Sequence, residues 1–264
     1  MRVSRVTVLG LFFAAAFFVA TAGAARAQIA GEFDPPPGNC CLPSQAQSLA
    51  NQLQDWNQLG RYHKDNQKLL AAAPERGRVV FMGDSITDMW KLEQSFPGKP
   101  YVNRGIGGQT TPQMLARMYP DVIRLRPAAV VIFAGTNDIA RNTGPTTLGM
   151  IQDNFRAMAE LAKAHGIKIV LCSVTPVSDY SRWPQTAARP PADILRVNGW
   201  LKEYAAEIGA EYVDYHAALA DDKGFLKDGF SMDGLHPNEK GYALMAPLVE
   251  AAIEKALRQT AGGR

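Results

Sequence analysis

Residues 78–90 read RVVFMGDSITDMW, and this stretch decides the fold of the chain. Val79 to Met82 form a continuous apolar run, which is typical of a parallel strand covered on both faces. Gly83 and Asp84 then turn the chain out of the sheet, so that Ser85 lies at the carboxyl end of the first strand. Open α/β sheets bind ligands at that edge, which makes Ser85 a candidate site residue. The simpler alternative is that Asp84 or Ser85 only caps the following helix.

Apolar runs with strand character alternate with helical patterns along the rest of the chain. This alternation predicts βαβ units with right-handed crossovers, and therefore an α/β fold with a parallel sheet. The predicted strands are residues 79–82, 101–103, 129–134, 167–174 and 211–215, and the predicted helices between and after them are 114–125, 148–165, 192–208 and 239–257.

The N-terminal residues carry the pattern of an export signal. Arg2 and Arg5 precede an apolar run, and Ala25-Arg26-Ala27 fits a small-x-small cleavage site. We therefore expect an exported protein, periplasmic or secreted, without stable membrane insertion after cleavage; an uncleaved anchor is the alternative. The expected divisions are a signal peptide at 1–27, a Pro-rich linker at 28–43, a helical extension packed on the sheet at 44–74, and the main domain at 75–264.

Charge and cysteine content exclude several classes of function. The formal net charge of +3 disappears when the three signal arginines leave, so nothing points to nucleic acid or an anionic membrane as a partner. Three cysteines are too few for a disulfide framework and lack the C-x-x-C spacing of a zinc site. Cys172 is expected to be a buried apolar residue, and the pairing of Cys40 and Cys41 is left open.

Four short blocks of glycine and polar residues follow predicted strands or lie near the C-terminus. Each block alone is explained by a turn or a helix cap. Together they supply a hydroxyl group, free backbone N–H donors, a side-chain amide, an imidazole and a carboxylate, which is the set of groups that acyl transfer requires. The blocks are Gly83–Ser85, Asn103–Gly108, Gly135–Asp138 and Asp233–Pro237.

These blocks resemble those of the SGNH hydrolases, also called the GDSL esterase and lipase family. The resemblance extends from about Arg78 to the last helix, and it implies a three-layer αβα sandwich with a five-stranded parallel sheet of the flavodoxin-like type. Ile86 stands where the family name has Leu. The blocks NRGIGGQTT and GTND are most similar to the branch that holds platelet-activating-factor acetylhydrolase-like proteins and carbohydrate acetylesterases. No G-x-S-x-G elbow is present, which disfavours the ordinary α/β-hydrolase fold.

The resemblance implies a role for each block. Ser85 is the expected nucleophile, His236 the general base, and Asp233 the carboxylate that orients it. The expected oxyanion donors are the backbone N–H groups of Ser85 and Gly108 and the side-chain amide of Asn137. This chemistry requires no metal and no cofactor.

Some alternatives remain for these roles. Gly105 or Gly107 can replace Gly108 as the donor of the glycine block. His216 is the rival base, although it lacks a carboxylate at the same spacing.

The segment Ser178 to Pro191 is the expected substrate-shaping loop, because loops at this edge commonly carry specificity. Candidate substrate-binding residues are Tyr180, Arg182 and Trp183, which suit a sugar ring or an anionic group, and Trp90, which either lines the acyl pocket or packs in the core. An alternative for the loop is that its own Trp only staples it to the surface.

The expected substrate is a short-acyl ester, such as an acetyl ester, of a small molecule or polysaccharide. Alternatives are a lysophospholipase or thioesterase-like lipase, an O-acetyltransferase, and a non-catalytic carbohydrate-binding module. The sequence leaves the oligomeric state open.

Overall fold

The computed structural model describes residues 54–73 and 75–258. The expected signal peptide at 1–27, the linker at 28–43 and residues 44–53 of the expected helical extension lie outside these residues. None of the described helices combines the length and the apolar character needed to cross a bilayer.

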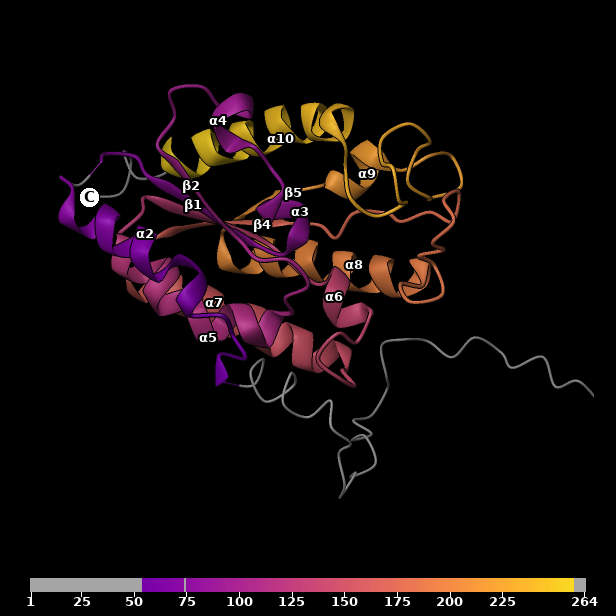
Figure 1. Ribbon diagram of the computed structural model, residues 1–264, viewed down its shortest axis with the longest axis horizontal. Helices are drawn as coiled ribbons and strands as arrows, with labels where there is room; N and C mark the ends of the chain where they lie inside the picture. The colour runs from indigo at the N-terminus through magenta and orange to yellow at the C-terminus, as the bar shows by residue number, and fades with distance from the viewer. Residues whose placement is uncertain (1–53, 74, 259–264) are drawn as a thin grey trace, which may run out of the picture.

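A parallel sheet of five strands forms the centre of the molecule (Figure 1). The strand order is β2-β1-β3-β4-β5, so the chain moves outward to one side after β1 and returns to the other side with β3. The point between β1 and β3 is therefore the topological switch point, where open α/β sheets place their ligands. This architecture confirms the predicted fold. The strands are β1 Val79–Gly83, β2 Tyr101–Gly105, β3 Ala129–Phe133, β4 Lys168–Cys172 and β5 Glu211–Val213.

Helices cover both faces of the sheet and make it a three-layer sandwich (Figure 1). One face carries α5 Thr111–Asp121, α7 Leu148–Ala164 and α8 Pro191–Ile208, and the other carries α4 Leu92–Ser95, α9 Tyr215–Leu219 and α10 Glu239–Arg258. Two short helices, α3 Ser85–Asp88 and α6 Thr136–Ile139, begin directly after β1 and β3.

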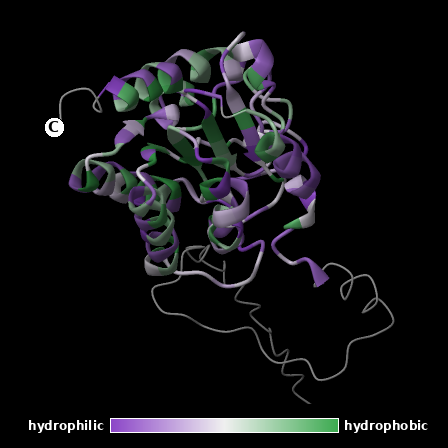
Figure 2. Ribbon diagram, turned by 90° about the vertical axis from the view of Figure 1, so that its left-hand side faces the viewer, coloured by the Kyte–Doolittle hydropathy of each residue, from purple (hydrophilic) through white to green (hydrophobic). Residues whose placement is uncertain are grey.

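The central strands are buried along their whole length because alternate side chains enter two different cores. Val80 and Met82 pack towards α5, α7 and α8, whereas Val79 and Phe81 pack towards α10. Figure 2 shows the same arrangement, with the most hydrophobic ribbon in the strands and on the helix faces turned towards them. Each fully buried aliphatic side chain contributes about 1.5–3 kcal/mol, so these strands hold the sheet edge rigidly in place.

The helix that follows β2 differs in its bounds from the sequence prediction. The helix expected at 114–125 begins at Thr111, because Thr110 and Gln113 form a capping box, and it ends at Asp121 before a short 3-10 turn, Ile123–Leu125. In the extension, α2 Gly60–Ala71 packs against α5 and this turn. α2 also contacts the sheet at its edge strand β2, because Asn66 accepts from the Arg104 guanidinium and the Tyr62 hydroxyl donates to the Gly105 carbonyl. The described part of the extension therefore packs on the edge of the sheet, while α5 and α7 cover the adjoining face.

Candidate active site

Ser85 is the first residue of α3 and follows β1 after a single turn. Asp84 is the N-cap of this helix, and its Oδ1 accepts a hydrogen bond of 2.9 Å from the Ile86 N–H. Asp84 therefore caps α3 as considered, and the Ser85 hydroxyl lies partly buried at the carboxyl edge of the sheet.

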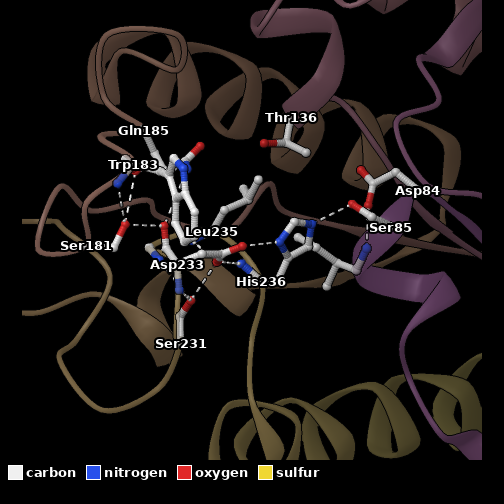
Figure 3. Close-up of polar contacts among 12 residues, drawn as sticks. Asp84, Ser85, Thr136, Ser181, Trp183, Gln185, Ser231, Asp233, Leu235 and His236 are labelled. Carbon is white, nitrogen blue, oxygen red and sulfur yellow. Dashed lines mark hydrogen bonds and ion pairs between the residues drawn. The ribbon is translucent and has the colours of Figure 1, made fainter.

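A chain of two hydrogen bonds joins Ser85 to a histidine and a carboxylate (Figure 3). Ser85 Oγ lies 2.9 Å from His236 Nε2, and His236 Nδ1 lies 2.6 Å from Asp233 Oδ2. An ionised Asp233 accepts a hydrogen bond from the Nδ1–H group, and this fixes the tautomer in which Nε2 presents its lone pair to the hydroxyl group.

Asp233 is held by the turn that it starts. Its Oδ1 accepts hydrogen bonds from Ser231 Oγ at 3.0 Å and from the backbone N–H groups of Leu235 at 3.0 Å and His236 at 2.8 Å. Partial burial alone raises the pKa of Asp233, but the hydrogen bonds from His236 and Leu235 outweigh it and lower the pKa to about 2. The carboxylate is therefore charged at neutral pH, as the orientation of His236 requires.

The glycine loop after β2 lies against Ser85. A side-chain carbon built on Gly107 would lie 3.8 Å from Ser85 Cβ. Gly108 has a φ of +79°, in the left-handed region that favours glycine, and its carbonyl accepts a hydrogen bond of 3.1 Å from Asn142 Nδ2. The loop thus passes beside the nucleophile at Gly107, and the carbonyl of the next residue, Gly108, is held by Asn142; the role of the Gly108 N–H as an oxyanion donor stays a prediction.

Asn137 lies on α6 and is almost fully buried, with 3% of its surface exposed. Its Nδ2 donates to the Gln109 carbonyl at 3.1 Å, and its Oδ1 accepts from an Arg189 Nη2 at 3.3 Å. An amide nitrogen carries two hydrogens, and no second bond of this Nδ2 is present among the described residues. The structure therefore brings the Asn137 amide to the Gln109 carbonyl and leaves its second Nδ2 hydrogen without a partner among the described residues.

The candidate substrate-binding residues divide into two groups. Trp90 is only 3% exposed and packs in an aromatic cluster with Phe81, Phe96 and Tyr242. The expectation that it lines the acyl pocket is not met, because hardly any of its ring can touch a ligand.

The three loop residues are accessible. Tyr180 is 40% and Trp183 is 53% exposed, and the Arg182 guanidinium lies 4.0 Å from the centroid of the Trp183 ring. Their loop reaches the catalytic turn, because Ser181 Oγ donates to the Asp233 carbonyl at 3.0 Å (Figure 3).

His216, the rival base, lies on α9. Its backbone N–H donates to Ser173 Oγ at 2.8 Å, and no contact in the described part of the chain joins it to Ser85. Burial lowers the pKa of His216. The geometry therefore favours His236.

Two further carboxyl groups lie close to the site and are fully buried. Burial raises the pKa of Asp84 and of Asp138 to about 6 in each case. Asp138 is compensated by hydrogen bonds from the Thr111 N–H and hydroxyl groups, whereas Asp84 Oδ2 has no partner in the described residues.

Sequence reasoning missed the residues that hold the site from behind. Arg189 was expected in an accessible loop, but it is 8% exposed and points inward to Asn137. Gln109, which accepts at its carbonyl from Asn137, was noted only as part of the glycine block. The one signal for Arg189 is its position just before Pro190 and Pro191, which start α8 at the same edge of the sheet.

A sequence model described as the GDSL-like Lipase/Acylhydrolase family matches residues 81–244. The chain belongs to this family. The match includes Ser85, Asn137, Asp233 and His236, so all the side chains assembled at the sheet edge lie within the GDSL-like domain.

Individual relatives of this GDSL-like protein are moderately similar. A candidate acylhydrolase from Bacteroides fragilis is 40% identical and has a TM-score of 0.72, covering 77% of this chain and 99% of that one. An acetylxylan esterase mutant structure from Geobacillus stearothermophilus shares the fold, with 22% identity, a TM-score of 0.57, and coverage of 69% of this chain and 95% of that one.

A curated acetylxylan esterase from Xylanibacter ruminicola is 26% identical over 214 residues, which is 67% of this chain. The match spans 43% of the length of that esterase, less than half of the relative.

Proposed function

We propose that this GDSL-like protein is a serine esterase that hydrolyses carboxylic esters through an acyl-enzyme. The observation that carries the proposal is the hydrogen-bonded series from Ser85 through His236 to Asp233, with distances of 2.9 and 2.6 Å. A serine hydroxyl is a weak nucleophile until an adjacent base accepts its proton, and this arrangement supplies that base already oriented.

In the proposed reaction, Ser85 Oγ attacks the ester carbonyl while His236 Nε2 takes the hydroxyl proton. The resulting oxyanion is met by the N–H groups of Ser85 and Gly108 and by the Asn137 amide. His236 then gives its proton to the departing alcohol, and an acyl-serine remains. Water repeats the same steps and releases the carboxylic acid.

The proposed substrate is an acetyl ester of a carbohydrate. Two observations support this choice: the similarity to an acetylxylan esterase, and the exposed Trp183 and Arg182 in a loop that contacts the catalytic turn. An aromatic ring beside a guanidinium provides a flat face and a hydrogen-bond donor, both of which suit a sugar ring.

The test is hydrolysis of p-nitrophenyl esters of graded acyl length by the wild-type protein and by Ser85→Ala. We expect a rate that is highest for acetate and that disappears in the variant, while circular dichroism shows an unchanged fold. A fluorophosphonate probe, which labels activated serines, should modify Ser85 and no other residue by mass spectrometry. Full activity of pure Ser85→Ala would overturn the proposal.

The same assay separates the alternatives. A maximum with long acyl chains would indicate a lipase-like enzyme, and acetyl transfer to an added sugar in preference to water would indicate a transferase. Acetylated xylo-oligosaccharides then test the carbohydrate part directly, with acetate release as the readout. Export is also proposed, and N-terminal sequencing of the protein from the culture medium or periplasm should start at Gln28.

A further inference from the structure

Arg189 is a buried cation at the end of the loop between β4 and α8. All three guanidinium nitrogens donate to side chains: Nε to Thr136 Oγ1 at 3.0 Å, Nη1 to Gln185 Oε1 at 2.9 Å, and Nη2 to Asn137 Oδ1 at 3.3 Å. Two of these partners are successive residues of α6, the helix that carries the Asn137 amide.

The contact with Asn137 fixes which way the amide faces. Its Oδ1 accepts from a guanidinium that can only donate, and its Nδ2 donates to the Gln109 carbonyl, which can only accept. The flipped amide would place NH₂ against the guanidinium and Oδ1 against a carbonyl, so both bonds would be lost. The second Nδ2 hydrogen is therefore held in one direction before any substrate binds.

The charge of Arg189 also acts on the amide. A cationic donor on Oδ1 draws electron density from the amide nitrogen and strengthens its remaining N–H as a donor. Burial lowers the pKa of Arg189, while the charges of Asp84 and Asp233 oppose this shift. The guanidinium stays protonated, because an Arg pKa lies far above neutral pH.

We propose that Arg189 is a positioning residue for the oxyanion hole, which orients and polarises the Asn137 amide for the transition state. The inference rests on the proposed esterase function. It assigns to Arg189 a role in rate, beyond its role in anchoring the loop.

The loop anchoring is visible in the same contacts. Gln185, which accepts from Arg189, donates through Nε2 to the carbonyl groups of Trp183 at 3.0 Å and Asp233 at 3.4 Å (Figure 3). If Arg189 only anchored the loop, replacing it would loosen the loop. The experiment must separate that effect from an effect on Asn137.

The experiment measures kcat and KM for p-nitrophenyl acetate in Arg189→Met. We expect kcat to fall by about 10- to 100-fold with KM changed by less than about threefold, because the loss of a whole oxyanion donor costs about 100- to 1000-fold and Arg189 acts on one donor indirectly. Arg196→Met is the matched control, since Arg196 is an exposed α8 arginine paired with Asp193. It should retain wild-type kinetics.

A double-mutant cycle with Asn137→Ala decides between the two roles. Asn137→Ala alone should lower kcat far more than it raises KM. In the Asn137→Ala background, Arg189→Met should lower kcat by less than about a further threefold, because the amide on which Arg189 acts is absent. Multiplicative losses in the cycle, or a change confined to KM, would overturn the proposal. If Arg189→Met fails to fold, Arg189→Lys enters the same cycle with the same expectation of non-additivity.

Ser85→Ala, measured alongside, keeps the two proposals apart. Retained hydrolysis in Ser85→Ala would remove the esterase proposal itself. An inactive Ser85→Ala together with an unchanged kcat in Arg189→Met would remove only the positioning role of Arg189.

Discussion

At the scale of single residues, Asp84 has an uncompensated buried carboxyl group. One oxygen caps α3 through the Ile86 N–H, and the other has no partner in the described residues. Burying a carboxylate with one oxygen unpaired costs free energy, and burial raises the pKa of Asp84 to about 6 although the nearby charges of His236 and Arg189 oppose the shift. The residue that positions the nucleophile therefore destabilises the fold at neutral pH.

We predict that Asp84→Asn stabilises the protein more at pH 8 than at pH 4. Well below the unfolded-state pKa of 3.8, the carboxyl group is protonated in both the folded and unfolded states. As pH rises from about 4 to about 6, the unfolded state ionises first, and the stability of the wild type falls while that of the variant is unaffected. The expected difference in the effect between the two pH values is on the order of 2–3 kcal/mol.

The measurement is urea unfolding of both proteins at each pH. The change in unfolding free energy on substitution is compared between the two pH values. This comparison cancels the cost of burying the introduced amide with an unpaired NH₂, because that cost does not depend on pH. An effect of Asp84→Asn that is equal at both pH values would contradict the burial argument.

The chemistry of single residues was accessible from the sequence only where it coincided with strand ends. Ser85, Asn137 and His236 belong to recognisable blocks; in the structure a hydrogen bond joins Ser85 to His236, and Asn137 donates to the Gln109 carbonyl. Their roles in catalysis stay predictions until they are measured. For Trp90 the structure agrees with the alternative of core packing, whereas Arg189 was not expected to be buried, because its partner Asn137 is 52 residues away in the chain and leaves no local pattern.

At the scale of elements, the end of β2 touches the start of α3. A side-chain carbon built on Gly105 would lie 2.1 Å from the Asp88 backbone nitrogen and 2.5 Å from the Thr87 carbonyl carbon. Asn103 supports the same contact, since its Nδ2 donates to the Thr87 carbonyl at 2.6 Å. The helix that starts with Ser85 is therefore seated on a strand whose last residue has no room for a side chain.

We predict that Gly105→Ala destabilises the protein by about 1–3 kcal/mol or more, because backbone atoms must move to admit the methyl group. The thermal midpoint of unfolding measures this. Gly107→Ala is the control for stability, since its added carbon would meet nothing closer than 3.8 Å. Equal midpoints for the two variants would show that α3 and β2 adjust without cost.

Most of the elements were predictable because buried parallel strands are continuous apolar runs and the helices between them have their own periodicity. The residues at which the elements begin and end were less predictable. The end of α5 at Asp121 and the following 3-10 turn depend on Val122, whose φ and ψ of −124° and −66° leave the helical path. The short α9 was not expected as a helix at all, since its five residues are too few to show a period.

At the scale of the whole molecule, a buried polar network joins α2, β2, α5 and β1. Asn66 on α2 accepts from the Arg104 guanidinium at 2.8 and 3.0 Å and donates to Asp121 at 2.6 Å. Asp121 pairs with Arg117 at 3.1 Å, and Arg117 in turn donates to the Gly83 carbonyl at 3.0 Å. The described part of the extension is thus bound to the strand that presents the nucleophile.

We predict that Asn66→Ala destabilises the whole domain by about 1–3 kcal/mol, because buried donors of Arg104 lose their acceptor and Asp121 loses a donor. Urea unfolding followed by far-ultraviolet circular dichroism should show one transition with a lower midpoint. Gln67→Ala is the neighbouring control, since within residues 54–73 and 75–258 the Gln67 side chain bonds only to the exposed His63. A transition that separates into two steps in Asn66→Ala would mean that α2 unfolds independently.

The long sequence separation between the nucleophile and its base has a consequence for folding. Ser85 and His236 are 151 residues apart in the chain, and nearly the whole sheet forms between them. The aromatic contacts of Phe81 with Trp90, Phe96 and Tyr101, by contrast, close within a short segment. Contacts between distant residues form slowly because a long loop must be ordered first. During refolding, ester hydrolysis is therefore a late signal that reports the completed chain.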